Sequence, residues 1–357
     1  MGIRASLFSG LLRKAFPRIE RGLLTAPLTL PLSYFGMHAE QPNLNVLTYG
    51  IYRQHDSYTN WSILEPTEGT YTGWVLARLD AHVANCVAKG RDFVYTFVTT
   101  PTWASNSPGA ADQAGPGGNH APANFGKLTN FVNFILNRYK TQIQAGLKFY
   151  AEGWNEPNTP GWYNDTMANL VLHQQTIWNA VQAFNTTNGT AVKVISPSWT
   201  QRVGIDIGVS SLKAFINAGG NPYFDIIGFH PYMGDGYFLD VDRQVADLLK
   251  TYLASIGNTK DIWWTEVGRT DFYAATANEV ARQLLYAAAM GIKRFIWYVE
   301  DLKGVPEDAV LPDMRVSRNP AAWNQAVAML ANKTIDSVSL INDGRIRALI
   351  NGVSVIL

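Results

Sequence analysis

The stretch "LKFYAEGWNEP" (147–157) begins with large apolar residues and ends in a group of polar ones. Its first half is typical of a strand that is covered on both faces. Its second half carries Glu152, Asn155 and Glu156 and then a proline. A carboxylate at the end of a buried strand is costly unless it is used, so the stretch predicts a strand that leads into a functional site.

Seven other short, mostly apolar segments repeat this pattern along the chain. With the first stretch they give eight expected strands at 33–38, 46–53, 92–99, 147–155, 191–198, 224–232, 261–268 and 294–300. Helices are expected between them, for example at 125–141, 165–184, 240–255 and 277–290, with Asp165 as an N-cap and Gly291 ending the last one.

Strands that alternate with helices predict parallel strands joined by right-handed crossovers. Eight such units in about 300 residues predict a (β/α)8 barrel, a TIM barrel of the α/β class. A doubly wound open sheet is the alternative, but no G-x-G-x-x-G follows the first strand.

Three regions are expected along the chain: an N-terminal segment (1–32), the catalytic barrel (33–334) and a short β appendage (335–357). The N-terminal segment is basic and amphipathic, which predicts a helix or docking segment for oligomerisation or attachment to a particle. An atypical targeting signal is the alternative, because Arg13 and Lys14 interrupt its apolar stretch. In the appendage, Asn342, Asp343 and Gly344 predict a hairpin turn.

Composition narrows the class of protein. Hydrophobic residues make up 47% of the 357 residues and the formal net charge is +1, so a large core is expected and a nucleic-acid partner is not. The sequence has no apolar run long enough for a transmembrane helix. The single cysteine, Cys86, rules out an intramolecular disulfide and is expected to be a buried helical residue.

Polar and aromatic residues stand at the carboxyl ends of the expected strands, which in a barrel all face one mouth. They are His38, Arg53, Asn155, Glu156, His230, Tyr232, Glu266 and Trp297. Two glutamates from the fourth and seventh strands, Glu156 and Glu266, are therefore expected to meet in one cavity. The insert 103–123, rich in Gly, Pro and Ala, is expected to lie at the same rim as a flexible loop or a substrate-facing lid.

Two carboxyl groups with different environments are what the cleavage of a glycosidic bond requires. One stays protonated to donate to the leaving oxygen, and the other stays ionised; a separation of about 5 Å gives retention and a wider one gives inversion. Arg53 is expected to keep Glu266 ionised, and Tyr232 to orient it. Asn155 is expected to bind a sugar hydroxyl.

Other residues have structural alternatives. Glu152 lies inside its strand and is expected to be a structural partner of a basic residue. His230 and His38 each belong either to the site or to the core, and Asp56 and Asp301 are possible mouth residues. Trp103, Trp162 and Trp297 are candidates for stacking on sugar faces. Only His38 and His230 of the six histidines stand at suitable strand ends, so no metal site and no cofactor are expected.

The motifs "GWNEPN", "WWTEVG", "GFHPY" and "RFIWY" resemble the signature sites of glycoside hydrolase clan A. Trp61, Glu65, Pro66, Gly69 and Tyr71, together with "TPTWAS" around Trp103, resemble family 39 and its relatives. Those include β-xylosidases and endoglycosidases that cut bacterial biofilm exopolysaccharide. The resemblance spans about Tyr34 to Asn332.

By position, the resemblance implies that Glu156 is the acid/base and Glu266 the nucleophile of a retaining mechanism. It implies that Arg53, Asn155, His230, Tyr232 and Trp297 line the cleavage subsite. The expected substrate is a polysaccharide, with endo-cleavage of a bacterial exopolysaccharide favoured. An exo-acting β-xylosidase-like enzyme and a non-catalytic or virion-associated carbohydrate-binding barrel are the alternatives. An extracellular, periplasmic or virion-associated location is expected, although no clear signal peptide is present.

Overall fold

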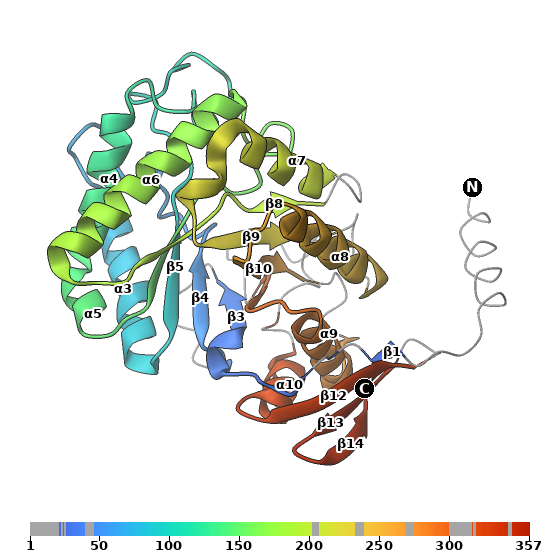
Figure 1. Cartoon of the computed structure of the whole chain (residues 1–357). Coiled ribbons are helices and arrows are strands. Elements are labelled where there is room, and N and C mark those ends of the chain that lie inside the picture. Colours follow the sequence, from blue (N-terminus) through green and yellow to red (C-terminus); the bar gives the residue numbers. More distant parts are fainter. Residues whose placement is uncertain are drawn as a thin grey trace.

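The computed structural model describes residues 21–22, 24, 26–39, 46–201, 207–232, 239–268, 274–299, 316, 319–341 and 345–357. Eight parallel strands form a closed ring at the centre of the molecule (Figure 1). In ring order they are β3 (Phe35–His38), β4 (Ile51–Gln54), β5 (Asp92–Thr96), β6 (Phe149–Glu152), β7 (Lys193–Ile195), β9 (Ile226–His230), β10 (Asp261–Val267) and β11 (Phe295–Trp297). Since β11 pairs with β3 and β10 with β9, the ring has no open edge, and the expected (β/α)8 barrel is confirmed.

Helices surround this ring on its outer side (Figure 1). They are α2 (Trp61–Leu64), α3 (Gly73–Lys89), α4 (Phe125–Arg138), α5 (Lys140–Gln144), α6 (Met167–Asn188), α7 (Ile207–Phe215), α8 (Leu239–Ser255), α9 (Ala277–Ala289) and α10 (Pro320–Leu330). Short elements complete the barrel: the helical turns η1 (Leu32–Tyr34), η2 (Ile216–Gly220) and η3 (Asn221–Tyr223), and the strand β8 (Trp199–Thr200), which pairs with β9.

One of the expected helix ends differs in the structure, and another is confirmed. The N-cap of α6 is Thr166, one residue after the expected Asp165, because the Thr166 hydroxyl accepts a hydrogen bond from the Asn169 amide at 3.1 Å. Asp165 instead accepts from the Thr166 amide and from the Asn169 side chain. Gly291 follows α9 with a φ of 87°, as expected for a glycine that ends a helix.

Alternation along the strands separates an outer core from the barrel interior. Outward side chains such as Phe93 and Trp264 belong to the large core beneath the helices. The lower half of the interior is filled by a second apolar group: Ile51, Val94, Tyr150, Ile195, Ile226, Trp263 and Ile296. A Cβ on Gly36 would lie 2.7 Å from Ile296 and 2.8 Å from Ile51, so β3 needs a glycine there. Polar side chains occupy the upper half, at the carboxyl ends of the strands.

A separate antiparallel sheet lies beside α9 and α10 (Figure 1). Its strands are β1 (Arg21–Gly22), β2 (Leu28–Thr29), β12 (Thr334–Leu340), β13 (Ile346–Ile350) and β14 (Val353–Ile356). The expected C-terminal β appendage is therefore present. However, β1 and β2 come from the expected N-terminal segment and pair with β12, so the two ends of the chain share one sheet. Residues 1–20 of the expected helix or docking segment (1–32) and the turn at Asn342, Asp343 and Gly344 lie outside the described residues.

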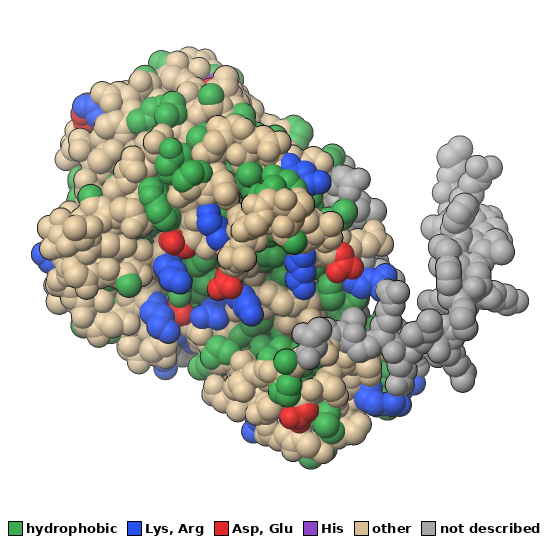
Figure 2. All heavy atoms as spheres, viewed as in Figure 1, with side chains coloured by type: hydrophobic (Ala, Val, Ile, Leu, Met, Phe, Trp, Pro, Cys, Tyr) green, Lys and Arg blue, Asp and Glu red, His purple; other side chains and the backbone are tan. Residues whose placement is uncertain are grey.

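The surface carries charges of both signs. Figure 2 shows Lys and Arg side chains interspersed with Asp and Glu across this face rather than separated by sign, in keeping with a net charge of +1. Among the described helices, none is long and apolar enough to cross a membrane. Cys86 is buried on α3, as expected, and its burial raises the pKa of the thiol to about 12.

Candidate active site

Glu156 projects from a tight turn after β6. The strand ends at Glu152, three residues earlier than expected, and Asn155 then makes an isolated parallel bridge to Ser198. The Glu156 amide donates to the Ser198 carbonyl at 2.8 Å, and Glu156 has a φ of 43°. A glutamate in this left-handed region is uncommon and costs free energy, and such residues cluster at functional sites. The turn brings the Glu156 carboxylate over the end of β9.

A β-bulge in β10 positions Glu266. Trp264 pairs with Phe295 and Val267 with Trp297, so three steps along β10 match two along β11. Strict alternation would place Glu266 on the outer face, in phase with Trp264. The extra residue re-aims the side chain into the barrel, which is a common use of bulges beside active sites. Glu266 is 8% exposed.

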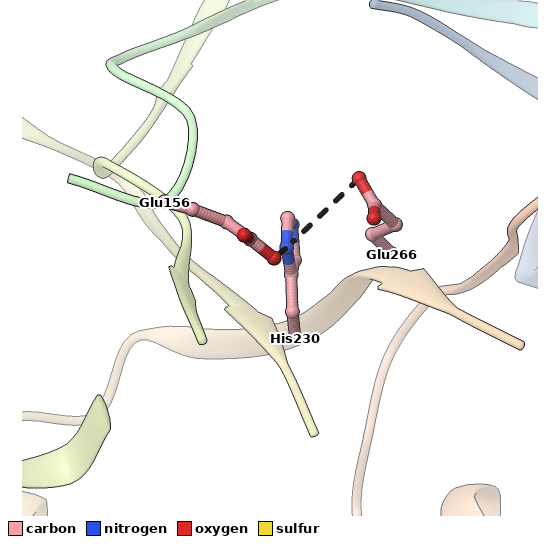
Figure 3. A group of neighbouring side chains, drawn as sticks. All are labelled: Glu156, His230 and Glu266. Atoms are coloured by element: carbon pink, nitrogen blue, oxygen red, sulfur yellow. Dashed lines mark hydrogen bonds and ion pairs between the residues drawn. The ribbon is translucent and has the colours of Figure 1, made fainter. Parts of the chain in front are cut away.

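His230, at the end of β9, lies between the two glutamates (Figure 3). Its Nδ1 is 2.8 Å from Glu156 Oε1 and 3.9 Å from Glu266 Oε2. One oxygen of each carboxylate and this nitrogen all lie within 4.8 Å of one another. The expected meeting of Glu156 and Glu266 at the barrel mouth is therefore what the structure shows.

Arg53, at the end of β4 and fully buried, connects three strands. Its Nε donates to Glu152 Oε2 at 2.7 Å, its Nη1 to Glu266 Oε2 at 2.9 Å and its Nη2 to Asn155 Oδ1 at 2.6 Å. Glu152 also accepts from Thr96 Oγ1 at 2.6 Å and from the Ser198 hydroxyl. Glu152 is thus a buried partner of a basic residue, as expected. Asn155 is held with its oxygen toward Arg53.

The electrostatics of Glu266 differ from the expectation. Burial and the Glu156 carboxylate raise the pKa of Glu266, while His230 and Arg53 lower it, and the result is a pKa of about 7. Arg53 therefore opposes the rise but does not overcome it. Burial alone would raise the pKa of Glu152. The Arg53 guanidinium and hydrogen bonds from Ser198 and Thr96 more than offset this effect, so the pKa of Glu152 is lowered.

Tyr232 and His38 complete the surroundings of the pair. Tyr232 Oη donates to Glu266 Oε1 at 3.3 Å, and burial raises the pKa of this phenol well above its usual value, so it stays a donor. His38 is buried at the end of β3, edge-on to Tyr298 and 3.7 Å from Asp56 Oδ2. Burial and the positive charge of Arg53 lower the pKa of His38 well below its usual value, so the ring is neutral.

Trp297 and Trp103 each pack against another tryptophan. The prediction that Trp297 lines the cleavage subsite is wrong, because Trp297 is 0% exposed and packs edge-on against Trp323 of α10 in the outer core. Trp297 and Phe295 are two positions apart on β11, so both side chains point outward. Trp103 packs edge-on against Trp61 and donates its indole N–H to the Glu65 carbonyl at 2.8 Å.

Tyr298 is the mouth residue that the sequence analysis missed. It follows Trp297, so alternation alone would have placed it on the inner side of the strand. Its ring contacts His38, and its hydroxyl donates to Asp56 Oδ2 at 3.4 Å. Asp301 lies outside the described residues.

The insert 103–123 is anchored to the connection between β6 and α6. Asp165 accepts from the Asn106 side chain at 2.7 Å and from the Ala121 amide at 3.0 Å, and Asp112 accepts from the Asn164 side chain at 2.7 Å. These hydrogen bonds anchor the insert at the mouth, where its residues Gln113, Ala114 and Asn119 line a cavity, so the insert faces the site, as expected of a substrate-facing lid.

Among the described residues, one trio has the spacing of metal ligands: Glu156, His230 and Glu266. The Arg53 guanidinium already binds the Glu266 oxygen that faces this trio, and a second cation there would be repelled. The arrangement therefore fits a hydrogen-bonded carboxyl pair better than a metal centre.

Comparison with known proteins agrees with this geometry. The family described as "Glycosyl hydrolase catalytic core" matches residues 84–317. The chain therefore belongs to the glycosyl hydrolase catalytic core family. No match to a curated protein was found.

Solved structures share the fold at low sequence identity. A family 39 glycoside hydrolase from Bacteroides cellulosilyticus WH2 has a TM-score of 0.65 and 17% identity, over 91% of this chain and 69% of that one. A monomeric β-xylosidase from Caulobacter crescentus CB15 has a TM-score of 0.61 and 14% identity, over 91% and 74%. The catalytic domain of xylanase C, family 30, from Talaromyces cellulolyticus has a TM-score of 0.52 and 12% identity, over 91% and 84%. These likenesses show that the chain shares its barrel fold with these enzymes.

Proposed function

We propose that this protein is a retaining glycoside hydrolase in which Glu266 is the nucleophile and Glu156 the general acid/base. The observation that carries the proposal is the distance between the two carboxylates, whose nearest oxygens lie within 4.8 Å. Retaining enzymes hold their carboxyl groups about 5 Å apart, whereas inverting enzymes leave space for a water molecule between them.

The contacts of each glutamate support these roles. Glu266 accepts hydrogen bonds from a guanidinium, Arg53, and from a phenol, Tyr232, both of which stabilise a carboxylate. Glu156 is hydrogen-bonded to His230 and to Thr159, whose Oγ1 lies 3.2 Å from Glu156 Oε2. An imidazole nitrogen accepts as readily as it donates, so a protonated Glu156 is accommodated.

The reaction then takes two steps. The Glu266 carboxylate attacks the anomeric carbon while the Glu156 carboxyl gives its proton to the departing glycosidic oxygen, and a glycosyl–enzyme ester forms. Glu156, now ionised, removes a proton from water as that water attacks the anomeric carbon. The bond to Glu266 breaks, and both glutamates return to their starting states.

Asn155 is placed to bind the sugar at the reacting centre. Its oxygen is held by Arg53, and its buried Nδ2 has no hydrogen-bond partner among the described residues. A buried donor without a partner costs free energy that a sugar hydroxyl would recover. A contact that strengthens as the transition state forms would lower the barrier.

The substrate that we propose is a polysaccharide, cut internally, with a bacterial exopolysaccharide favoured by the resemblance to family 39 and its relatives. Exo-cleavage of a β-xyloside is the second candidate, because one similar structure is a β-xylosidase. Because such a polymer lies outside the cytoplasm, the location that we propose for the enzyme is extracellular, periplasmic or virion-associated.

The test is the release of reducing ends from bacterial exopolysaccharides, xylan and aryl β-glycosides. Glu156→Gln and Glu266→Gln are run beside Glu68→Gln, an exposed control. We expect both site variants to lose activity by several powers of ten and the control to keep it. Tight binding of one polymer without cleavage would replace this proposal with the non-catalytic binding protein.

A further inference from the structure

A cavity of about 560 Å³ opens at the barrel mouth beside Asn155. The walls of the cavity are formed by the loop after β4, the insert after β5, the segment after β6 and the end of β11. Its lining includes Gln54, Asp56, Tyr58, Thr99, Ala114, Asn155, Trp162 and Tyr298. The volume falls in the range of roughly 300–1,000 Å³ that is typical of small-molecule sites.

Strained backbone gathers around this cavity. Six non-glycine residues of the described part have a positive φ, and three of them, Asp56 (51°), Tyr58 (59°) and Thr99 (60°), line it. Another of the six is Glu156, which lies outside the lining. Strain of this kind persists where the surrounding structure enforces it, and it concentrates at ligand sites. Thr99 is held by the Ser62 hydroxyl at 2.8 Å.

Two buried polar atoms in the lining have no protein partner among the described residues. They are the acceptor Gln54 Oε1 and the donor Asn155 Nδ2, on residues that are each 1% exposed. The other amide atom of each residue is engaged: Gln54 Nε2 by Ser57 at 2.9 Å and Asn155 Oδ1 by Arg53. The unpartnered pair is therefore fixed in position and matches sugar hydroxyls, which both donate and accept; Asn155 Nδ2 carries two N–H groups, one for the sugar at the reacting centre and one for the neighbouring unit.

Charge limits what the cavity can hold. Among the described residues that line the cavity, Asp56 is the single acidic side chain, and none is a lysine or an arginine. Arg53, behind Asn155, is fully buried and donates to Glu152, Glu266 and Asn155. A carboxylate on a sugar would meet Asp56 with no cation to balance it, whereas an ammonium group would be attracted.

Trp162 supplies an apolar surface to the same space. It is half-buried, and its backbone carbonyl accepts from Trp154 Nε1 at 3.0 Å, which fixes the turn that carries it. The partly positive C–H face of a pyranose packs well on the negative face of an indole.

We propose that this cavity is an accessory subsite that holds one neutral or amino-bearing pyranose unit of the substrate chain next to the point of cleavage, and that it rejects uronic acid units. The inference rests on the proposed function, since it extends the same site by one sugar.

The first experiment separates the subsite from the chemistry. We compare kcat/KM for an oligosaccharide of the cleaved polymer with kcat/KM for the matching aryl monoglycoside. Trp162→Ala removes the platform, and Ala114→Phe fills the cavity. Their controls are Trp74→Ala, at an exposed tryptophan of α3, and Ala111→Phe, at an exposed position of the insert that does not line the cavity.

We expect the ratio of the two constants to fall about fivefold to tenfold in the cavity variants, and to stay unchanged in the controls. An equal ratio in cavity and control variants would overturn the subsite while leaving the hydrolase intact. If the wild-type protein cleaves neither the polymers nor the aryl glycosides, the proposed function is overturned instead, and the binding experiment then decides the subsite alone.

The second experiment measures binding to the Glu266→Gln protein by tryptophan fluorescence. Three β-1,4-linked tetramers share one backbone: cellotetraose, tetraglucuronic acid and the glucosamine tetramer. We expect tetraglucuronic acid to bind at least about tenfold more weakly than the others, and Asp56→Asn to reduce that gap about fivefold, with Glu68→Gln as the control. Equal binding of all three tetramers, or binding of none, overturns the proposal.

Discussion

Arg53 Nη1 on β4 lies 2.9 Å from Glu266 Oε2 on β10, and the same guanidinium binds Glu152 on β6 at 2.7 Å. One buried cation therefore serves two buried carboxylates, and a third carboxylate, Glu156, lies close by. Two uncompensated negative charges in a barrel interior would be costly, so the layer retains a proton near neutral pH. That proton is the one that a general acid needs.

Removal of the guanidinium is expected to destabilise the protein strongly. Arg53→Met leaves Glu152 and Glu266 buried without their cation, and we expect the free energy of unfolding to fall by about 3–5 kcal/mol. Urea unfolding measures this change. The double variant Arg53→Met/Glu152→Gln should recover part of the loss. For comparison, Arg138→Met breaks a partly exposed pair with Asp80 and should cost no more than about 1 kcal/mol.

Arg53→Lys tests the geometry rather than the charge. An ammonium group cannot reach the three acceptors that the planar guanidinium binds at once. We expect kcat/KM to fall roughly a hundredfold, because one donor to the nucleophile is lost or misplaced. A lysine variant with wild-type activity would show that the three-way contact is unimportant.

The pH dependence of kcat/KM follows from the raised pKa of Glu266. The two glutamates are close enough to share one proton, so the value of about 7 describes the loss of that proton from the pair. Above it both carboxylates are ionised and no acid remains. We expect kcat/KM to decline about tenfold per pH unit above pH 7. A profile that stays flat to pH 9 would contradict this assignment.

The same raised pKa predicts how stability depends on pH. A carboxyl whose pKa is higher in the folded than in the unfolded state favours folding at low pH, and this contribution is lost as pH rises through about 7. Glutamine never ionises and so avoids the loss. We expect Glu266→Gln to be more stable than wild type at pH 8, by at most ~3 kcal/mol, with the difference disappearing below pH 4.5. Thermal melts at the two pH values measure it.

Trp297 is expected to act on stability and not on catalysis. Trp297→Phe leaves space against Trp323 in the outer core, and we expect the free energy of unfolding to fall by about 1–3 kcal/mol with kcat/KM within twofold of wild type. Tyr298→Ala, one residue later at the mouth, should instead lower kcat/KM at least about tenfold. The opposite pattern in the two variants would restore Trp297 as a substrate contact.

Much of the barrel and its mouth could be predicted from the sequence, because apolar segments of strand length recur between amphipathic ones and end in polar residues. Glu156, Glu266, Arg53, His230 and Tyr232 were all found in this way. Position at a strand end decides which edge of the barrel a residue occupies, and that is readable from the sequence alone.

The face of the strand on which a side chain lies, inside or outside the barrel, was harder to predict. Glu266 faces inward only because of the bulge between Trp264 and Val267, and a one-residue bulge leaves no sign in the apolar pattern. Trp297 faces outward because no such bulge precedes it on β11. The pKa of Glu266 depends on burial and on Glu156, which are properties of the assembled barrel. The accessory cavity likewise depends on the contacts of Asp112 and Asp165, which join distant loops.

The most direct test of the account is the configuration of the azide product formed by two variants on an activated aryl glycoside. In Glu266→Gly, azide takes the place of the missing nucleophile, and we predict a glycosyl azide of inverted configuration. In Glu156→Gly, the glycosyl–enzyme still forms and azide releases it, and we predict retained configuration. Both products are identified by NMR. An inverted product from Glu156→Gly, or retained configuration from Glu266→Gly, would contradict the assigned roles.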